Sequence, residues 1–330
     1  MNAVTSRFTL NHRLPPDHYL AGLREDVRRG LAAPPRILSP KWFYDERGSE
    51  LFEKITALPE YYLTRAEFEI LSAHAEQIAA VVRARTLVEL GSGSSRKTRL
   101  LLDALAAAGT LACYAPVDVS PSALTAAGAA LCEEYQGLRV AASVADFEQG
   151  LALAPADPSP RLLAFLGSTL GNFDPGQRER LYAEFHRALG RDDWLLLGAD
   201  LVKGPEVLVP AYNDSMGITA EFDKNVLHVI NRELDADFDP GEFDHVALWN
   251  AADERIEMRL RSRKAQNVKV RALDLVVDFA AEEELRTEIS AKFRREPLTA
   301  ELERAGFELR EWWTDRAGRF ALLLARPIEH

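Results

Sequence analysis

Apolar residues occur along the chain in short runs, and longer amphipathic stretches separate these runs. In the first two thirds of the chain, five apolar runs predict β-strands, and the stretches between them have helical spacing. The predicted strands are residues 86–90, 110–119, 138–142, 161–166 and 193–201, and the predicted helices are residues 94–108, 121–135 and 175–189. Strands that alternate with helices are typical of a parallel sheet with helices on both faces. The pattern therefore predicts an α/β, doubly wound, Rossmann-like fold.

The flanking segments have a different pattern. The polar and proline-rich N-terminal segment has one predicted helix at 19–30, and a helical stretch at 212–234 precedes alternating runs that predict antiparallel strands. Those strands are residues 246–250, 255–262 and 267–276; residues 278–292 predict a loop and helix, and the chain ends with a helix at 298–305 and a hairpin. We expect one domain of residues 62–203 and 287–330. A second, α+β domain would comprise residues 8–61 and 204–286, so the N-terminal segment and an insert form it together.

One further helix is predicted just before the first of the five strands. Thr64 and Glu67 have the spacing of a capping box, and Ile70, Leu71 and Ile78 continue an apolar face. We therefore expect Glu67 to fold back onto the first turn of a helix that follows Thr64.

The first strand of the series ends at a glycine turn, Gly91-Ser92-Gly93. Glycine permits positive φ and lets a ligand approach the backbone, and the N–H groups of the following helix favour an anionic part of that ligand. A dinucleotide is one candidate, but Arg96 occupies the position where that fingerprint requires a third glycine. An ordinary turn that needs glycine only for its backbone explains this motif equally well.

Polar residues also follow the later strands. Asp118 ends the second strand, where a carboxylate can accept hydrogen bonds from both ribose hydroxyls of a nucleoside. Asp146 and Phe147 follow the third strand and offer an acceptor for an adenine amine beside an apolar ring. Gly167 follows the fourth strand. Ligands of parallel sheets bind at the carboxyl ends of the strands, so this order favours an adenosyl cofactor.

Composition narrows the possible partners. The net charge of −11 argues against a nucleic-acid partner, since phosphate backbones require a clustered basic surface. Two cysteines and seven scattered histidines have no metal-ligand spacing, so we expect no metal. No stretch approaches the roughly 18 consecutive apolar residues of a membrane span, and the N-terminus has no apolar signal core. We therefore expect a cytoplasmic protein that acts on a small molecule without a membrane partner.

Several motifs together resemble a known family. Glu89-x-Gly91-x-Gly93 is similar to motif I of the class I methyltransferases, which bind S-adenosylmethionine and also end in a hairpin. Five segments resemble the L-histidine Nα-methyltransferases of ergothioneine biosynthesis: LVELGSGSSRKT (87–98), FLGSTLGNF (165–173), GADLVK (198–203), NVLHVINREL (225–234) and TEIS (287–290). The resemblance extends from about Tyr44 to Ala325.

The resemblance implies a metal-free enzyme that transfers three methyl groups from S-adenosylmethionine to the α-amine of L-histidine, giving hercynine. We expect this enzyme to be a monomer. The implied cofactor-binding residues are Gly91, Lys97, Asp118, Asp146 and Phe147. The implied substrate-binding residues are Gly167, Asn172 and Tyr212 for the backbone end, Tyr61 or its neighbour Tyr62 and Met258 for the pocket, and Glu288 and Ser290 for the imidazole. Tyr44 and Asn172 are the candidates for handling the amine proton.

The residues alone leave other functions open. Without the resemblance, Glu288 would be a solvated acid on a glutamate-rich helix, and Met258 would be part of a core. A methyltransferase for another amino acid or small amine, and a non-catalytic nucleotide-binding module, both remain compatible with the glycine turn. A nicotinamide dehydrogenase is disfavoured by Arg96.

Overall fold

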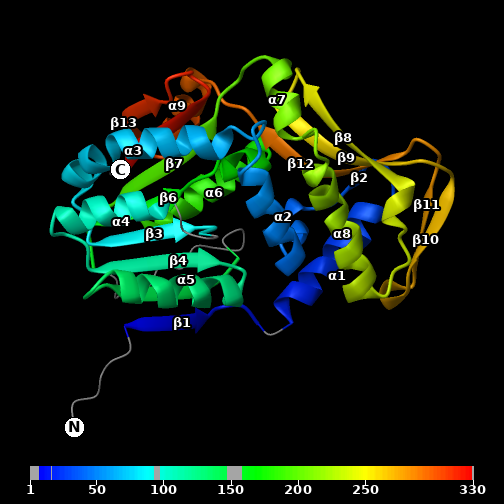
Figure 1. Cartoon of the computed structure of the whole chain (residues 1–330), viewed down its shortest axis with the longest axis horizontal. Coiled ribbons are helices and arrows are strands. Elements are labelled where there is room, and N and C mark those ends of the chain that lie inside the picture. Colours follow the sequence, from blue (N-terminus) through cyan, green and yellow to red (C-terminus); the bar gives the residue numbers. More distant parts are fainter. Residues whose placement is uncertain (1–6, 16, 93–96, 147–157, 329–330) are drawn as a thin grey trace, which may run out of the picture. The chain divides into compact units, whose positions relative to one another are not determined.

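The structure is a computed structural model that describes residues 7–15, 17–92, 97–146 and 158–328. The chain forms two compact units (Figure 1). The first unit comprises Met1–Pro15, Arg65–Leu201 and Phe293–His330, and the second comprises Pro16–Thr64 and Val202–Lys292.

The first unit contains an eight-stranded sheet in the order β1-β5-β4-β3-β6-β7-β14-β13. Its strands are β1 (Phe8–His12), β3 (Thr86–Leu90), β4 (Cys113–Asp118), β5 (Arg139–Val144), β6 (Arg161–Phe165), β7 (Trp194–Asp200), β13 (Phe307–Thr314) and β14 (Phe320–Pro327). Neighbouring strands from β1 to β7 are parallel, whereas β14 is antiparallel to both β7 and β13. This order confirms the predicted α/β, Rossmann-like fold with a terminal hairpin.

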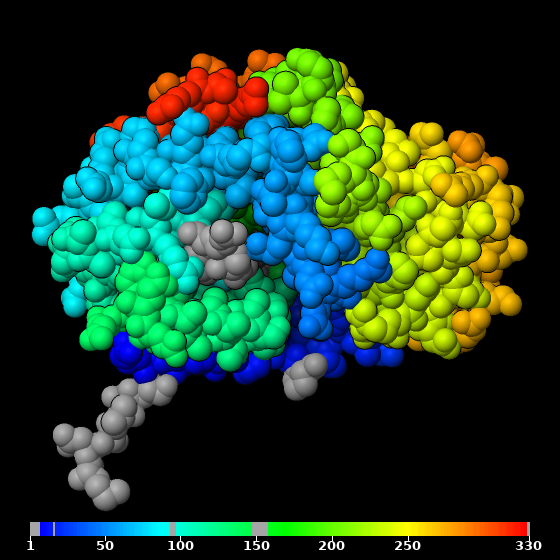
Figure 2. Space-filling view, in the orientation of Figure 1, coloured from blue at the N-terminus to red at the C-terminus, as the bar shows by residue number. Residues whose placement is uncertain are grey.

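Helices cover this sheet because its central strands are apolar on both faces. Leu162 and Leu163 in β6 and Leu195 and Leu196 in β7 are fully buried. The helices are α3 (Leu63–Val82), α4 (Thr98–Ala107), α5 (Pro121–Glu134), α6 (Pro175–Ala188) and α9 (Arg295–Arg304). From the side shown in Figure 2, α3 and α5 form much of the surface of this unit. No helix in the described part of the chain is long and apolar enough to cross a membrane.

The second unit is built on a four-stranded sheet in the order β2-β12-β9-β8. Its strands are β2 (Arg36–Ile37), β8 (Phe243–Asn250), β9 (Arg255–Ser262) and β12 (Glu284–Ala291), and a separate hairpin joins β10 (Gln266–Val270) to β11 (Leu275–Phe279). The helices are α1 (His18–Leu31), α2 (Glu46–Thr56), α7 (Pro205–Ala211) and α8 (Ile218–Leu234). Helix α8 packs on α2, β8 and β9 and contributes buried residues to this unit.

Two sequence predictions about these elements were wrong. The predicted helix within 278–292 is the strand β12, and the predicted strand 267–276 contains β10, a 3₁₀ turn and the start of β11. The glutamates near β12 suggested a solvated helix face. Glu284 instead accepts hydrogen bonds from Arg261 on the neighbouring strand, from Nε at 3.0 Å and from Nη2 at 2.7 Å.

The predicted domain boundaries differ most from the observed ones at two places. Residues 8–12 form β1 and extend the sheet of the first unit by pairing with β5, although we assigned this segment to the second domain. Residues 287–292 belong to the second unit, because β12 pairs with β9 and β2 inside its sheet. This correction moves Glu288 and Ser290 into the second unit.

Candidate active site

The first group of predicted site residues lies at the carboxyl ends of the central strands, where the strand order of the first sheet reverses. Strands β3 and β6 are neighbours in the middle of the sheet, and the chain proceeds from them towards opposite edges, which is where parallel sheets bind ligands. Gly91 follows β3 with φ +67°, and its N–H donates to Val117 O at 2.8 Å. This positive φ favours glycine. Among the described residues no atom lies within 4 Å of a Cβ added to Gly91, so they leave space beside it for a ligand.

Both ends of the glycine turn are held by Glu89. Its buried carboxyl accepts hydrogen bonds from Thr98 Oγ1, the first residue of α4, at 2.6 Å and 2.7 Å. Tyr114 on β4 donates a third bond at 2.5 Å. Burial raises the pKa of Glu89 to about 7, although these hydrogen bonds oppose the shift. The motif acid therefore ties β3 to the start of α4.

The predicted acids lie on neighbouring strands of the same sheet. Asp118 ends β4 and its carboxylate accepts from Ser120 N at 3.0 Å. Ala145 N, just after the end of β5, donates to Asp118 O at 3.1 Å. The buried Asp146 is the next residue, so it lies beside the end of β4. Phe147 lies outside the described residues. Gly91, Asp118 and Asp146 are thus brought to one edge of one sheet.

Sequence reasoning missed the role of Glu67. Its fully buried carboxylate accepts from Gly167 N at 2.7 Å and forms an ion pair with Lys97. The predicted capping box is therefore wrong, since α3 begins at Leu63 and Glu67 is directed into the sheet edge. A Cβ on Gly198 would lie 2.1 Å from Glu67 Oε1, so glycine at this position leaves room for the carboxylate.

The loop after β6 has a defined shape. Gly167 and Ser168 have φ values of +76° and +59°, in the left-handed region. Ser168 Oγ accepts from Asp200 N at 2.9 Å, which anchors the loop to the end of β7. Asn172 ends the 3₁₀ turn Thr169–Asn172 and is half-buried.

The second group of predicted site residues lies on β12 and the strand beside it. Glu288, Ser290 and Lys292 occupy alternate positions, so their side chains leave the same face of the sheet. Met258 on β9 pairs directly with Glu288 and is buried. Lys292 was not predicted, because its segment was assigned to a helix. The alternation Glu-x-Ser-x-Lys was the signal that could have revealed it.

Glu288 is the buried acid of this second group. Its exposed fraction is 9%, yet no residue in the described part of the chain donates a hydrogen bond to its carboxyl group. The pKa of Glu288 is raised to about 8, because burial and the nearby Asp223 carboxylate raise it more than Lys292 and His245 lower it. A buried polar group without a partner is costly, which makes this carboxyl a candidate ligand contact.

Tyr212 joins the β12 residues through its hydroxyl. The phenol oxygen lies 2.8 Å from Ser290 Oγ, and Lys292 Nζ lies 2.8 Å from each of these two oxygens. All three side chains are buried. The structure thus groups Tyr212, which follows α7, with Ser290 of β12 and with Lys292, which directly follows that strand.

A buried histidine holds the main chain of Tyr212. His245 Nδ1 lies 2.7 Å from Asp223 Oδ2, and its Nε2 donates to Tyr212 O at 2.8 Å. Burial lowers the pKa of His245, but hydrogen bonds and the charge of Asp223 outweigh this and raise it. Thr287 donates to the other oxygen of Asp223 at 2.5 Å. This network links α8, β8 and β12.

Aromatic side chains form the third predicted part of the site. Tyr44, which is 37% exposed, makes edge contacts with Phe52 and Phe222 at centroid distances of 5.6 Å and 5.4 Å. Tyr61 contacts Phe52 at 6.1 Å and Tyr212 at 6.3 Å. The Tyr62 hydroxyl instead accepts from Lys203 at 2.7 Å. Of the two neighbouring tyrosines, the ring of Tyr61 is therefore the one packed on Tyr212.

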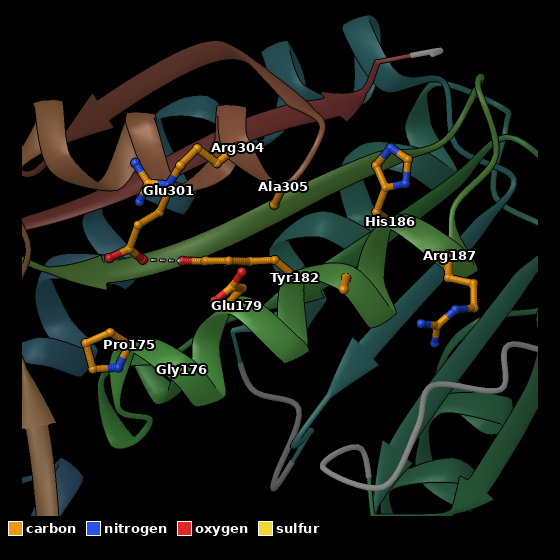
Figure 3. Close-up of a pocket in the computed structure, with 10 residues that line it drawn as sticks. Pro175, Gly176, Glu179, Tyr182, His186, Arg187, Glu301, Arg304 and Ala305 are labelled. Atoms are coloured by element: carbon orange, nitrogen blue, oxygen red, sulfur yellow. Dashed lines mark hydrogen bonds between the residues drawn. The ribbon is translucent and has the colours of Figure 1, made fainter.

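A separate surface pocket lies between α6 and α9 of the first unit (Figure 3). Two of its lining residues bond to each other, because Tyr182 OH donates to Glu301 at 3.3 Å. Arg178, which lies outside the lining, donates through Nη2 to the same carboxylate at 2.7 Å. The pocket contains none of the predicted site residues. Over the described ranges, no group of three or more His, Cys, Asp or Glu residues could hold a metal ion.

The residues near the glycine turn fit S-adenosylmethionine. Gly91 leaves open space beside its backbone, Asp118 and Asp146 supply carboxylate acceptors, and Lys97 supplies a cation for a carboxylate. A parallel sheet with this strand order, an antiparallel end and these acids defines a class I S-adenosylmethionine-dependent methyltransferase. Residues 23–327 match the family model described as "Histidine-specific methyltransferase, SAM-dependent". The chain belongs to this family.

Similar proteins cover nearly the whole chain. The chain is 52% identical to the histidine N-alpha-methyltransferase of Mycolicibacterium smegmatis, over 96% of this chain and 98% of that protein. It is also 52% identical to the histidine N-alpha-methyltransferase of Mycobacterium tuberculosis, over 97% and 99% of the two chains. Ergothioneine biosynthesis protein 1 of Neurospora crassa is 36% identical over 60% of this chain and 23% of its own length.

Proposed function

We propose that this chain is an L-histidine Nα-methyltransferase that transfers three methyl groups from S-adenosylmethionine to the α-amine of L-histidine. The product is hercynine, and the reaction belongs to ergothioneine biosynthesis. Family membership and the 52% identical relatives support this proposal. The main structural support for histidine as the substrate is the buried carboxyl of Glu288. It has no hydrogen-bond partner among the described residues and lies on the same strand face as Ser290.

We assign the cofactor to the sheet edge of the first unit. Asp118 would accept from the ribose hydroxyls, and Asp146 and Phe147 would contact the adenine ring. Gly91 would leave room for the backbone of the turn to approach the cofactor, and Lys97 would bind its carboxylate. S-adenosylmethionine, when bound, supplies an electrophilic methyl group.

We assign imidazole recognition to the second unit. Glu288 and Ser290 would each bond one ring nitrogen, and Met258 and Tyr61 would line the pocket. An apolar side chain in this pocket would leave the buried carboxyl unpaired, and rejection of that kind is strong. Tyr212, Gly167 and Asn172 would bind the backbone end of the amino acid.

The protein must also manage a proton. An α-amine with a pKa near roughly 8 is mostly protonated at pH 7, so a residue must accept or relay its proton before each attack. Tyr44 and Asn172 are our candidates for this step. The trimethylated product is a quaternary ammonium, for which the faces of Tyr61 and Tyr212 would offer cation–π attraction of about 1 kcal/mol.

Turnover tests this function directly. The purified protein is incubated with S-adenosylmethionine and a mixture of amino acids, and the products are weighed by mass spectrometry. We expect histidine alone to become heavier, finally by three methyl groups. Methylation of another amino acid or small amine in preference to histidine would contradict the substrate assignment and leave the methyltransferase class intact. A monomeric, cytoplasmic enzyme remains a prediction.

A further inference from the structure

Lys292 is a buried cation with no role so far in the proposed reaction. Its side chain is only 4% exposed, and its Nζ lies 2.8 Å from both Tyr212 OH and Ser290 Oγ. The same Nζ lies 4.6 Å from the centre of the Tyr212 ring. The backbone holds this position as well, since Lys292 N donates to Glu254 O at 2.8 Å. Burying a lysine costs free energy unless its ammonium group is paired or hydrogen-bonded.

The chemistry of the three groups sets the direction of their hydrogen bonds. An ammonium has three donors and no acceptor, so the oxygens of Tyr212 and Ser290 both accept from Lys292. The two hydroxyls are 2.8 Å apart, so one of them donates to the other. A phenol is a stronger acid than an aliphatic hydroxyl and is the better donor. This acidity favours Tyr212 as the donor and Ser290 as the acceptor.

This arrangement leaves the Ser290 hydroxyl with one hydrogen-bonding role towards a ligand. A hydroxyl oxygen has two lone pairs. In Ser290 one accepts from Lys292 and, with Tyr212 as the favoured donor, the other accepts from Tyr212. The remaining capacity of Ser290 is its own O–H donor. A ring nitrogen that faces Ser290 must then be an acceptor, which means that it carries no proton.

We propose that Lys292 is a positioning residue that leaves the Ser290 hydroxyl able only to donate a hydrogen bond to the substrate. The site then selects the neutral imidazole, with its unprotonated nitrogen towards Ser290. This inference rests on the proposed function and extends it to the protonation state of the substrate. The other ring nitrogen then carries the N–H and donates to Glu288, two residues before Ser290 on the same face. An imidazolium would place two donors opposite each other at Ser290 and would be rejected.

A double-mutant cycle tests whether Lys292 acts through Ser290. Lys292→Met keeps an unbranched side chain, shorter by one atom, and removes every donor. We expect it to raise the KM for histidine roughly tenfold to a hundredfold, with a smaller change in kcat. In the Ser290→Ala background the same substitution should change this KM by less than about threefold, since neighbours that act together are not additive. An equal effect of Lys292→Met in both backgrounds would overturn the proposal.

Two controls separate this role from a general loss of structure or charge. The affinity for S-adenosylhomocysteine, which we assign to the first unit, should stay the same in Lys292→Met. Lys264→Met removes an exposed ammonium of the second unit, paired with Glu242 at 3.2 Å, and should leave the KM for histidine unchanged. If Lys292→Met is poorly folded, Lys292→Gln retains one N–H donor group and should show a partial effect in the same cycle.

Two pyrrole analogues of histidine test the direction of the hydrogen bond. β-(Pyrrol-2-yl)alanine and β-(pyrrol-3-yl)alanine each keep one ring nitrogen as N–H and replace the other by carbon. The wild-type protein should reject the analogue whose N–H faces Ser290 more strongly than the other, and Lys292→Met should reduce that difference. Equal binding of both analogues by the wild type would contradict the donor role of Ser290. Failure of the wild type to bind histidine at all would instead contradict the proposed function.

Discussion

Each of the two units contains a buried glutamate with a raised pKa, and the two differ in their partners. Glu89 in the first unit accepts hydrogen bonds from Thr98 and Tyr114, and its pKa is raised by burial to about 7. Glu288 in the second unit has no hydrogen-bond donor in the described part of the chain, and burial raises its pKa to about 8. The comparison shows that a raised pKa alone does not identify a ligand site. The hydrogen-bond donors within the protein distinguish the two residues. Glu89 has such donors and stabilises the fold, whereas Glu288 has none among the described residues and is the candidate ligand contact.

The largest expected effect is on histidine recognition. Glu288→Ala removes the acceptor for the ring N–H, and a buried polar group left without its partner costs about 1–3 kcal/mol, so the KM for histidine should rise roughly fivefold to over a hundredfold. Binding of S-adenosylhomocysteine should stay within about twofold of wild type. Glu282→Ala, which removes an exposed acid just before β12, is the matched control. An unchanged histidine KM in Glu288→Ala would mean that other residues recognise the imidazole.

The matching substitution in the first unit should affect stability instead. Glu89→Ala leaves the buried hydroxyls of Thr98 and Tyr114 without their acceptor, and we expect the free energy of unfolding to fall by about 2–4 kcal/mol. Chemical denaturation measures this loss. Glu288→Ala should destabilise the protein far less, since no donor among the described residues loses a partner. Equal destabilisation by the two substitutions would remove the distinction between the two glutamates.

A third substitution tests the edge of the first sheet. Asp118→Ala should weaken S-adenosylhomocysteine binding by about 1–3 kcal/mol, because ribose hydrogen bonds are lost. Titration calorimetry measures this affinity, with Asp192→Ala, an exposed acid of the same unit, as control. Wild-type affinity in Asp118→Ala would contradict our placement of the ribose.

A fourth prediction concerns the pH dependence of stability. A carboxyl whose pKa is raised on folding binds its proton more tightly in the folded state, so its contribution to stability is present at low pH and is lost as pH rises. For Glu288 this loss extends from the unfolded value of 4.5 to about 8, and for Glu89 from 4.5 to about 7. Without ligands, Tm should therefore decline less between pH 5 and pH 8 in Glu288→Gln than in wild type. Identical declines would show that Glu288 does not titrate in this range.

The sequence predicted the first unit well because its signals are local. Apolar runs end at Gly91, Asp118 and Asp146, and parallel strands bring these ends to one edge without further information. The turn after β3, the acids after β4 and β5 and the terminal hairpin therefore followed from the order of the elements along the chain.

The second unit was predicted less well because its order depends on distant pairing. β12 was taken for a helix, since Glu284 reads as a solvated acid until Arg261 on β9 is placed beside it. Lys292 was overlooked for the same reason. Glu67 shows that the first unit has such a case too, because its partner Gly167 lies 100 residues away in sequence.

Histidine binding tests the central claim most directly. L-Histidine and, separately, L-phenylalanine are titrated by calorimetry into the protein saturated with S-adenosylhomocysteine. Our account predicts a clear binding isotherm for histidine and none for phenylalanine, since only the imidazole can satisfy both Glu288 and Ser290. Comparable binding of the two amino acids would contradict recognition of the imidazole by the buried carboxyl.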